Sequence, residues 1–275
     1  MESILGDVAG PGSAFNNMRH FISTYAWDHY GDKAPAGEFT SALEDMEPGS
    51  AVRCMNAGLS YLDNDPQAPA LDIGCAVGRT TFELASKVKG LTLGIDTSFP
   101  VLRVAQRVLR EGRVTFPLKR VGIVYDYHDY ELSLGSEQFI DFWACDVLAL
   151  PFADDSFNMV NALNVFDTVS SPRDFLAAIS NLLSSGGGAV LSTPYDWSPP
   201  TPLQAWVGGH SQRAGDNGDS EAILKSLLSP GSENRAGNGL TLVGEINSHP
   251  WYVRVHNRRW VRYDTHVLAC QKSVP

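Results

Sequence analysis

The stretch "APALDIGCAVGRTTFELA" (residues 68–85) joins a short apolar run to a helical pattern through a glycine turn. The run "PALDIG" (69–74) predicts a buried strand, and "GRTTFELASKV" (78–88) predicts a helix. At such a junction the first backbone N–H groups of the helix are unpaired, and glycine lets a ligand approach them closely. The stretch therefore predicts a strand–turn–helix unit whose turn can bind a ligand.

Strand and helix patterns alternate along the rest of the chain. In order they are a strand at 91–96, a helix at 100–112, strands at 139–146 and 157–164, a helix at 171–187, a strand at 188–195, and final strands at 240–246 and 261–271 joined by a basic connector. Alternation at this spacing predicts an α/β fold, in which helices cover both faces of a mostly parallel seven-stranded sheet.

Three segments interrupt this rhythm. Residues 1–62 read as a loose tail and a helical cap, with helices over "NNMRHFISTYAWDHYG" (16–31) and 51–62, and residues 63–275 as the main domain. Residues 113–138 are too polar and β-branched for a helix, so we expect an inserted hairpin. Residues 195–219 are rich in Trp, Pro and Gly, and a loop of that length is usually functional.

Composition narrows the partner class. The chain has 275 residues, 43% of them hydrophobic, and a formal net charge of −10, which disfavours nucleic acid and favours a small-molecule partner. No window approaches the roughly 20 apolar residues of a membrane helix, and the N-terminus does not resemble a secretory signal. The four cysteines form no C-x-x-C pair, so we expect no metal and a cytoplasmic protein with reduced thiols.

The glycine spacing argues against a dinucleotide. The fingerprint for NAD is G-x-G-x-x-G, whereas Gly74 and Gly78 are spaced G-x-x-x-G with Ala76 between them. A pyrophosphate needs the middle glycine, but S-adenosylmethionine (SAM) carries no phosphate and tolerates a small residue there. An NAD-dependent oxidoreductase is therefore disfavoured.

Acidic residues end the first three predicted strands. Asp72 lies two residues before Gly74 and suits the amino-acid end of SAM; Asp96, 24 residues later, suits the ribose hydroxyls. Asp146 suits the adenine amine, with Val147 at the ring. Each alone could be an ordinary strand-end acid, but together they predict SAM. The predicted cofactor-binding residues are Asp72, Gly74, Cys75, Ala76, Gly78, Arg79, Asp96, Thr97, Ser98, Asp146, Val147 and Asn164.

These motifs together resemble the class I SAM-dependent methyltransferases, which have a Rossmann-like fold. The segments "FNNMRHFISTYAWDHYG", "AVRCMNAGL", "ALDIGCAVGRTTFELA", "GIDTS", "GGGAVLSTPYDW" and "TPLQAWVGG" come in an order that resembles the ovothiol-biosynthesis methyltransferases, the 4-mercaptohistidine N1-methyltransferases. The match runs from about residue 15 to the C-terminus and is strongest over 68–98 and 186–209. In that family the module is often fused behind a sulfoxide synthase, which implies a functional link to such an enzyme.

The resemblance implies methyl transfer from SAM to an imidazole nitrogen of 5-thiohistidine, giving ovothiol and S-adenosylhomocysteine (SAH). This reaction needs alignment, exclusion of water, and an acceptor that fixes the ring tautomer. Asn164 and Asp167, at the end of "LNVFD", and Tyr195, after the fifth strand, are the catalytic candidates. Asp167 could equally be a helix-cap acid.

The substrate-binding candidates come from the cap, the insertion and the basic connector, and they are Tyr25, His29, Tyr30, Trp197, Trp206, Arg258 and Arg259. The arginines suit a substrate carboxylate, as Arg53 and Arg79 would, although Arg79 could instead serve the cofactor. The alternative for the aromatic residues is simple core packing.

Two other functions stay open: a methyltransferase for another small metabolite, and a SAM-binding module without catalysis. The intact acids and glycines of the turn argue against the second. Sequence does not decide between a monomer and a homodimer.

Overall fold

The computed structural model describes residues 13–39, 46–213, 217–230 and 239–274. The predicted tail at 1–13 lies outside these residues except for Ser13, which caps helix α2 (Ala14–Tyr30) by accepting a hydrogen bond from the backbone N–H of Asn16 at 3.3 Å. No helix among the described residues has the length and apolarity needed to cross a membrane.

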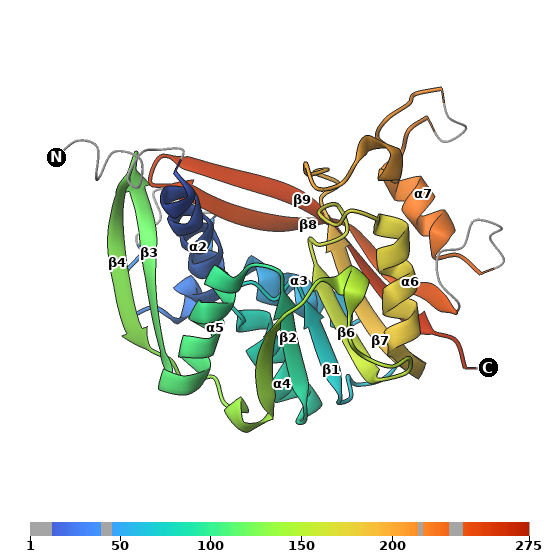
Figure 1. The fold of residues 1–275 in the computed structure, drawn as a ribbon, viewed down its shortest axis with the longest axis horizontal. Helices are drawn as coiled ribbons and strands as arrows, with labels where there is room; N and C mark the ends of the chain where they lie inside the picture. Colours follow the sequence, from blue (N-terminus) through green and yellow to red (C-terminus); the bar gives the residue numbers. More distant parts are fainter. Residues whose placement is uncertain (1–12, 40–45, 214–216, 231–238, 275) are drawn as a thin grey trace.

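A seven-stranded sheet forms the centre of the described part of the chain (Figure 1). Its strand order is β5-β2-β1-β6-β7-β9-β8, and every neighbouring pair is parallel except the two pairs made by β9. The strands are β1 (Ala70–Ile73), β2 (Thr92–Asp96), β5 (Ile140–Ala144), β6 (Phe157–Leu163), β7 (Leu183–Thr193), β8 (Leu240–His256) and β9 (Arg259–Lys272). This arrangement confirms the predicted mostly parallel α/β fold.

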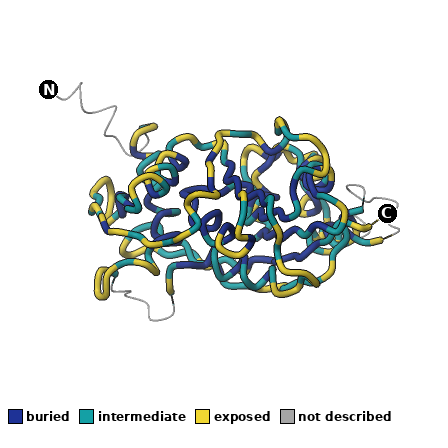
Figure 2. The backbone as a smooth tube through the Cα atoms, turned by 90° about the horizontal axis from the view of Figure 1, so that it is seen from below, coloured by how far each residue is buried: buried dark blue, intermediate teal, exposed yellow. Residues whose placement is uncertain are grey.

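Helices cover both faces of this sheet because its central strands are apolar on both sides. One face packs against α3 (Ser50–Leu59), α4 (Arg79–Val88) and α5 (Phe99–Glu111), and the other against α6 (Pro172–Leu182) and α7 (Ser220–Leu227). All four residues of β1 are buried. Figure 2 shows the buried residues concentrated along the middle of the molecule, with exposed residues around its rim.

The cap helix α2 is fixed to the glycine turn and to the inserted hairpin. The Tyr30 hydroxyl donates to the Val77 carbonyl at 2.7 Å, and the Tyr130 hydroxyl donates to the Tyr30 carbonyl at 2.7 Å. The hairpin consists of β3 (Arg113–Val121) and β4 (Val124–Glu131), which form a separate two-stranded sheet. The predicted insertion is confirmed, although its strands end at Glu131 rather than near residue 138.

Two predicted boundaries are wrong. Helix α6 ends at Leu182 instead of 187, and β7 begins at Leu183. Serine and glycine are poor helix formers, and here they extend along β6: Leu183 pairs with Phe157, and the Ser184 hydroxyl bonds to the side chain of Asn158.

The second wrong boundary is the basic connector expected between 246 and 261. Strand β8 instead continues to His256, with Trp251 paired to Tyr263 and Arg254 paired to Trp260. The end of this long hairpin lies beside α2 and β3 (Figure 1), where the Trp27 and Trp260 rings meet edge to face at 5.0 Å. These contacts with distant parts of the chain hold the segment extended.

Candidate active site

The glycine turn after β1 has the backbone shape that its sequence requires. Gly74, Ala76 and Gly78 all have left-handed backbone angles, with φ of 68°, 49° and 90°. A Cβ on Gly78 would come within 2.7 Å of Phe142, and one on Gly74 within 2.5 Å of Val165. The two glycines are therefore required by packing inside the protein as well as by any approaching ligand. Cys75 and Ala76 are buried between them.

Asp96 ends β2 beside this turn. Its Oδ2 accepts from the Ala76 N–H at 3.0 Å and its Oδ1 from the Ser98 N–H at 2.7 Å. Burial raises the pKa of Asp96, and the backbone hydrogen bonds oppose that rise. Each carboxylate oxygen keeps a lone pair for a ribose hydroxyl. Thr97, next to it, is exposed.

Asp146 follows β5 at the same edge. It is exposed, and its Oδ1 accepts from the Leu148 N–H at 2.9 Å. The Cys145 N–H donates to the Asp96 carbonyl at 3.1 Å, so the ends of β2 and β5 are joined directly. Val147 is buried next to Asp146. The structure thus brings Asp96, Asp146 and the glycine turn together.

Asp72 lies inside the protein, between β1, α4 and β6. It is 1% exposed, and its carboxylate accepts hydrogen bonds of 2.7 Å from Thr80 and Thr81 of α4 and from Asn161 of β6. Burial raises its pKa, and these three bonds counter the rise. These contacts tie β1 to α4 and β6, and the predicted role of Asp72 at the amino-acid end of SAM stays a prediction.

Asn164 and Asp167 follow β6 at the same edge of the sheet. Asn164 has a left-handed φ of 53°, and its side-chain oxygen accepts from the Ser192 hydroxyl at 2.9 Å. Asp167 is 2% exposed, and its Oδ2 accepts from the Asp196 N–H at 2.7 Å. Its Oδ1 is buried and has no hydrogen-bond partner among the described residues. Burial raises the pKa of Asp167, hydrogen bonds from the backbone N–H groups of Asp167 and Asp196 and from the Thr193 side chain oppose that rise, and the charge of Asp196 adds to it.

Tyr25 of the cap faces this cluster. Burial raises the pKa of Tyr25 to about 12, with further contributions from Asp96, Tyr263 and Asp167. Its hydroxyl has no hydrogen-bond partner within the described parts of the chain. Sequence reasoning missed Tyr263, whose hydroxyl donates to Asp196 at 3.2 Å. Tyr263 lies within the final strand predicted from sequence, but nothing near it in the sequence indicates its contact with Asp196.

His29, Tyr30 and Arg79 join the cap to the start of α4. Nδ1 of His29 accepts from the Arg79 N–H at 3.3 Å, and burial, assisted by the Arg79 charge, lowers the pKa of His29 to about 3. The Tyr30 hydroxyl donates to the Val77 carbonyl. His29 and Tyr30, which were predicted to bind the substrate, therefore bind the start of α4 and the glycine turn. The Arg79 guanidinium is 3% exposed, 3.4 Å from Asp32, and its Nε and Nη1 have no partner in the described residues.

Tyr195, Trp197 and Trp206 lie in the insertion after β7. The Trp197 and Trp206 rings stack at 5.7 Å, and the Trp206 indole N–H donates to the Thr201 carbonyl at 3.0 Å. These two tryptophans therefore form the insertion's own core. The Tyr195 hydroxyl lies 2.6 Å from Nδ1 of buried His266.

His266 continues this chain of polar contacts to Glu245, at 3.0 Å from its Nε2. Glu221, Glu245 and His266 are close enough to share a cation. Lys225, whose Nζ lies 2.9 Å from Glu245 and 3.6 Å from Glu221, already supplies positive charge there.

Arg258 and Arg259 lie apart from the other candidates. Both are exposed at the end of the β8–β9 hairpin, where the Asn257 N–H donates to the Arg120 carbonyl at 3.2 Å. Figure 1 shows this end beside α2 and the β3–β4 hairpin. The structure does not bring these arginines to Asp167.

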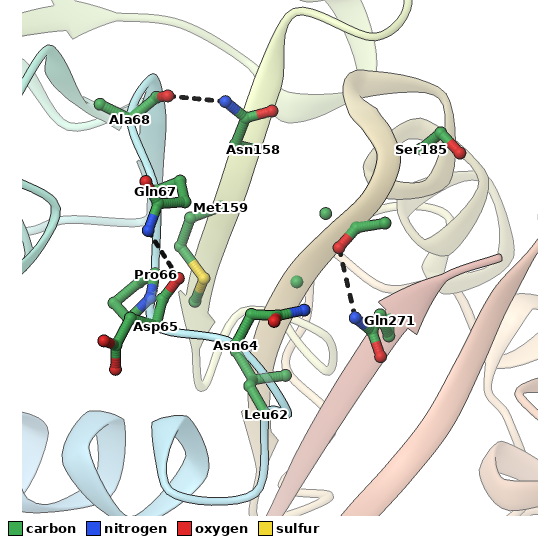
Figure 3. Close-up of a pocket in the computed structure, with 13 residues that line it drawn as sticks. Leu62, Asn64, Asp65, Pro66, Gln67, Ala68, Asn158, Met159, Ser185 and Gln271 are labelled. Atoms are coloured by element: carbon green, nitrogen blue, oxygen red, sulfur yellow. Dashed lines mark hydrogen bonds between the residues drawn. The ribbon is translucent and has the colours of Figure 1, made fainter. Parts of the chain in front are cut away.

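A cavity of about 480 Å³ lies at the opposite edge of the sheet (Figure 3). It is lined by Ala68 before β1, Asn158 at the start of β6, and Ser185 near the start of β7. Ligands of open α/β sheets bind at the carboxyl ends of the strands. This cavity at the amino ends is therefore separate from the cofactor site.

One solved structure agrees with the fold, and two further proteins show weaker similarity to this chain. The crystal structure of the [4+2]-cyclase SpnF superimposes with a TM-score of 0.55 at 15% identity, covering 94% of this chain and 95% of that one. The N-methyltransferase NodS from Bradyrhizobium japonicum, in complex with SAH, gives a TM-score of 0.47 at 16% identity over 89% and 98% of the two chains. An uncharacterized 37.1 kDa transposon protein from Streptomyces fradiae is 29% identical over 164 residues, which are 58% of this chain and 40% of that protein.

A protein-family model matches the central part of the chain. The model described as "Methyltransferase domain" matches residues 71–191, which run from β1 into β7 and include the glycine turn and the carboxyl ends of β1, β2, β5 and β6. The predicted cofactor is thereby confirmed as SAM, with SAH as product. Residues 71–191 therefore form a SAM-dependent methyltransferase domain.

Proposed function

We propose that this enzyme transfers the SAM methyl group to an imidazole ring nitrogen of the small molecule 5-thiohistidine, forming ovothiol. The proposal starts from the resemblance of its segments to the ovothiol-biosynthesis methyltransferases. The observation that carries it is Oδ1 of Asp167, a buried carboxylate oxygen without a partner among the described residues, at the carboxyl end of β6. A buried carboxylate oxygen needs a donor, and a ring N–H is one.

The residues around Asp167 suit a ring nitrogen. Asp96 and Asp167 both raise the pKa of Tyr25, which supports a position for Tyr25 near the acids that would bind the ribose and the acceptor. With one ring nitrogen donating to Asp167, the other keeps its lone pair for attack. The new N–C bond forms as the methyl C–S bond breaks, and the ring then loses its N–H proton. Burial raises the pKa of Asp167, which favours its acting as the proton acceptor.

The cofactor would be held by residues already described. Asp96 would bind the ribose hydroxyls, Asp146 and Val147 the adenine, and the turn from Gly74 to Gly78 the remaining polar atoms. The unpartnered Nε and Nη1 of Arg79 suit the cofactor carboxylate. When bound, SAM supplies the reactive methyl group on its sulfonium. Asn164 and Tyr195 remain candidates for orienting the acceptor.

The test is direct. Purified protein is incubated with SAM and 5-thiohistidine, with histidine and ergothioneine in parallel, and methylated products are identified by mass spectrometry. We expect ring-methylated thiohistidine only in the first reaction. Absence of that product, with SAH binding intact by calorimetry, would overturn the acceptor and leave a methyltransferase for another small metabolite. SAH binding without any methyl transfer to a panel of amines and imidazoles would indicate a binding module.

Asp167→Asn sharpens the test. The asparagine oxygen can still accept from the Asp196 N–H, while its NH2 group replaces the unpartnered acceptor Oδ1 with a donor. We expect kcat/KM for thiohistidine to fall about 100-fold, with unchanged SAH affinity. Asp154→Asn, at an exposed loop position, is the matched control. Equal activity of the two variants would remove Asp167 from the mechanism.

A further inference from the structure

A second cavity lies outside the cofactor site. It has a volume of about 280 Å³ and is bounded by α2, the β3–β4 hairpin and the end of the β8–β9 hairpin. Trp27, Phe39 and Trp260 give it aromatic walls, and Arg254, Glu38 and Asp126 give it charge. None of these residues belongs to the methyl-transfer site, so the cavity has no role in the function proposed above.

Arg254 is a cation without a carboxylate partner. Among the described residues no acid lies within ion-pair distance of its guanidinium, and its Nη2 donates to the neutral side chain of Asn257. Its Nη1 is buried with no hydrogen-bond partner in the described parts of the chain. Burial lowers the pKa of Arg254 to about 10, and only Asp126 acts against this. A partly buried guanidinium in this condition is stabilised by an anionic group from outside.

A second donor lies beside it. The guanidinium carbon of Arg254 is 5.7 Å from the centre of the Trp260 ring, and the indole Nε1 of Trp260 is also buried without a partner within the described residues. A buried indole N–H usually finds an acceptor. Two neighbouring donors and a planar guanidinium match a carboxylate, which accepts from such a fork.

The two acids that line the cavity differ in how many of their carboxylate oxygens already have a partner. Both oxygens of Asp126 bond to Arg120. Glu38 uses Oε1 for His128 Nδ1 at 2.6 Å, and its Oε2 has no partner among the described residues. Glu38 can therefore bind an ammonium group. The same two acids repel a dianion such as phosphate.

We propose that this cavity binds a zwitterionic α-amino acid with an aromatic side chain. Its carboxylate would pair with Arg254 and the Trp260 N–H, its ammonium with Glu38, and its ring would lie against Trp27 and Phe39. A volume of about 280 Å³ is at the small end of ligand pockets, which fits one amino acid rather than a peptide. The site is separate from the methyl acceptor and stands independently of the proposed reaction.

Calorimetry on the full chain tests this with four probes. L-Tryptophan and L-phenylalanine carry both charges, tryptamine lacks the carboxylate, and indole-3-propionate lacks the ammonium. We expect the amino acids to bind at least about tenfold more tightly than either analogue. Equal affinity for tryptamine, tighter binding of indole-3-propionate, or no heat from the amino acids at about 10 mM would overturn the proposal.

Variants locate the site. Arg254→Gln and Glu38→Gln should each weaken amino-acid binding about tenfold or more. Arg262→Gln is the control, because Arg262 is an exposed arginine of the same hairpin that pairs with Asp264 at 2.8 Å. SAH affinity, measured in parallel, should stay unchanged in all three and shows that each variant folds. Unchanged amino-acid binding in both Arg254→Gln and Glu38→Gln would place the ligand elsewhere and overturn the assignment.

Discussion

Oδ2 of Asp96 accepts a hydrogen bond from the backbone N–H of Ala76 at 3.0 Å, so the acid at the end of β2 and the glycine turn form one unit. Ala76 has a left-handed φ of 49°, a conformation that a residue with a side chain adopts at a cost. The bond from Asp96 helps to hold that conformation. Asp96 thus helps to order the turn, whatever it binds in addition.

Asp96→Ala should weaken both SAM and SAH binding. It removes the carboxylate that we propose accepts from two ribose hydroxyls, a loss of roughly 2 to 3 kcal/mol, or tens-fold to about 100-fold in Kd. Within the protein the carboxylate loses hydrogen bonds to backbone N–H groups of the turn and of the segment after β2, so we expect the chain to stay folded. Calorimetry with SAH gives the Kd, and Asp154→Ala is the exposed control. An unchanged Kd would mean that Asp96 does not hold the ribose.

Asp72→Ala should act on the fold instead. The substitution leaves Thr80, Thr81 and Asn161 without their buried acceptor, and each unsatisfied donor costs about 1 kcal/mol or more. We expect the free energy of unfolding in urea to fall by roughly 3 kcal/mol or more. If Asp72→Ala kept its stability and lost SAH affinity, Asp72 would have a direct role at the ligand.

Gly78→Ala separates two reasons why position 78 needs glycine, which are its backbone conformation and the lack of space for a side chain. Its φ of 90° makes any side chain unfavourable, and the added Cβ would lie 2.7 Å from Phe142 and 2.8 Å from Ala105. Gly122 also has a positive φ, of 55°, but a Cβ there would meet nothing within 4 Å. Gly122→Ala therefore measures the backbone cost alone, about 1 kcal/mol.

Gly78→Ala should cost roughly 2 kcal/mol more than that control, because the core must shift to admit the methyl group. Urea unfolding of both variants gives the comparison. Equal losses would show that Phe142 and Ala105 move aside freely, and would leave only ligand approach as a reason for Gly78.

The central sheet could be predicted from sequence because its signals are local. Apolar runs, a glycine turn and acids at strand ends define β1, β2 and β5 without knowledge of distant contacts. The strand order then brings Asp96 and Asp146 to one edge. Where local signals conflict with pairing, as in the Ser and Gly run at 183–188, sequence reasoning failed, because β6 rather than propensity sets that boundary.

The surroundings of the site depend on contacts between distant segments. Nothing near Tyr30 in sequence indicates that its hydroxyl binds Val77, and nothing near Trp27 indicates Trp260. Aromatic residues in a cap helix suit either a ligand or the core. Tyr25 faces the acids of the site and Trp27 faces the β8–β9 hairpin, and only the packed structure tells these two apart.

His29 makes the attachment of the cap sensitive to acid. Its folded-state pKa is lowered from 6.5 to about 3, because burial and the Arg79 charge disfavour the protonated ring. Below pH 6.5 the unfolded chain binds a proton that the folded chain does not. The contribution of His29 to the free energy of unfolding is therefore present above pH 6.5 and is lost as the pH falls toward 3, by roughly 2 kcal/mol between pH 7 and pH 5.

In His29→Asn, the amide oxygen can still accept from the Arg79 N–H and does not titrate. Urea unfolding at both pH values should show this loss in the wild type and a smaller one in the variant; identical losses would mean that the buried imidazole is not the titrating group.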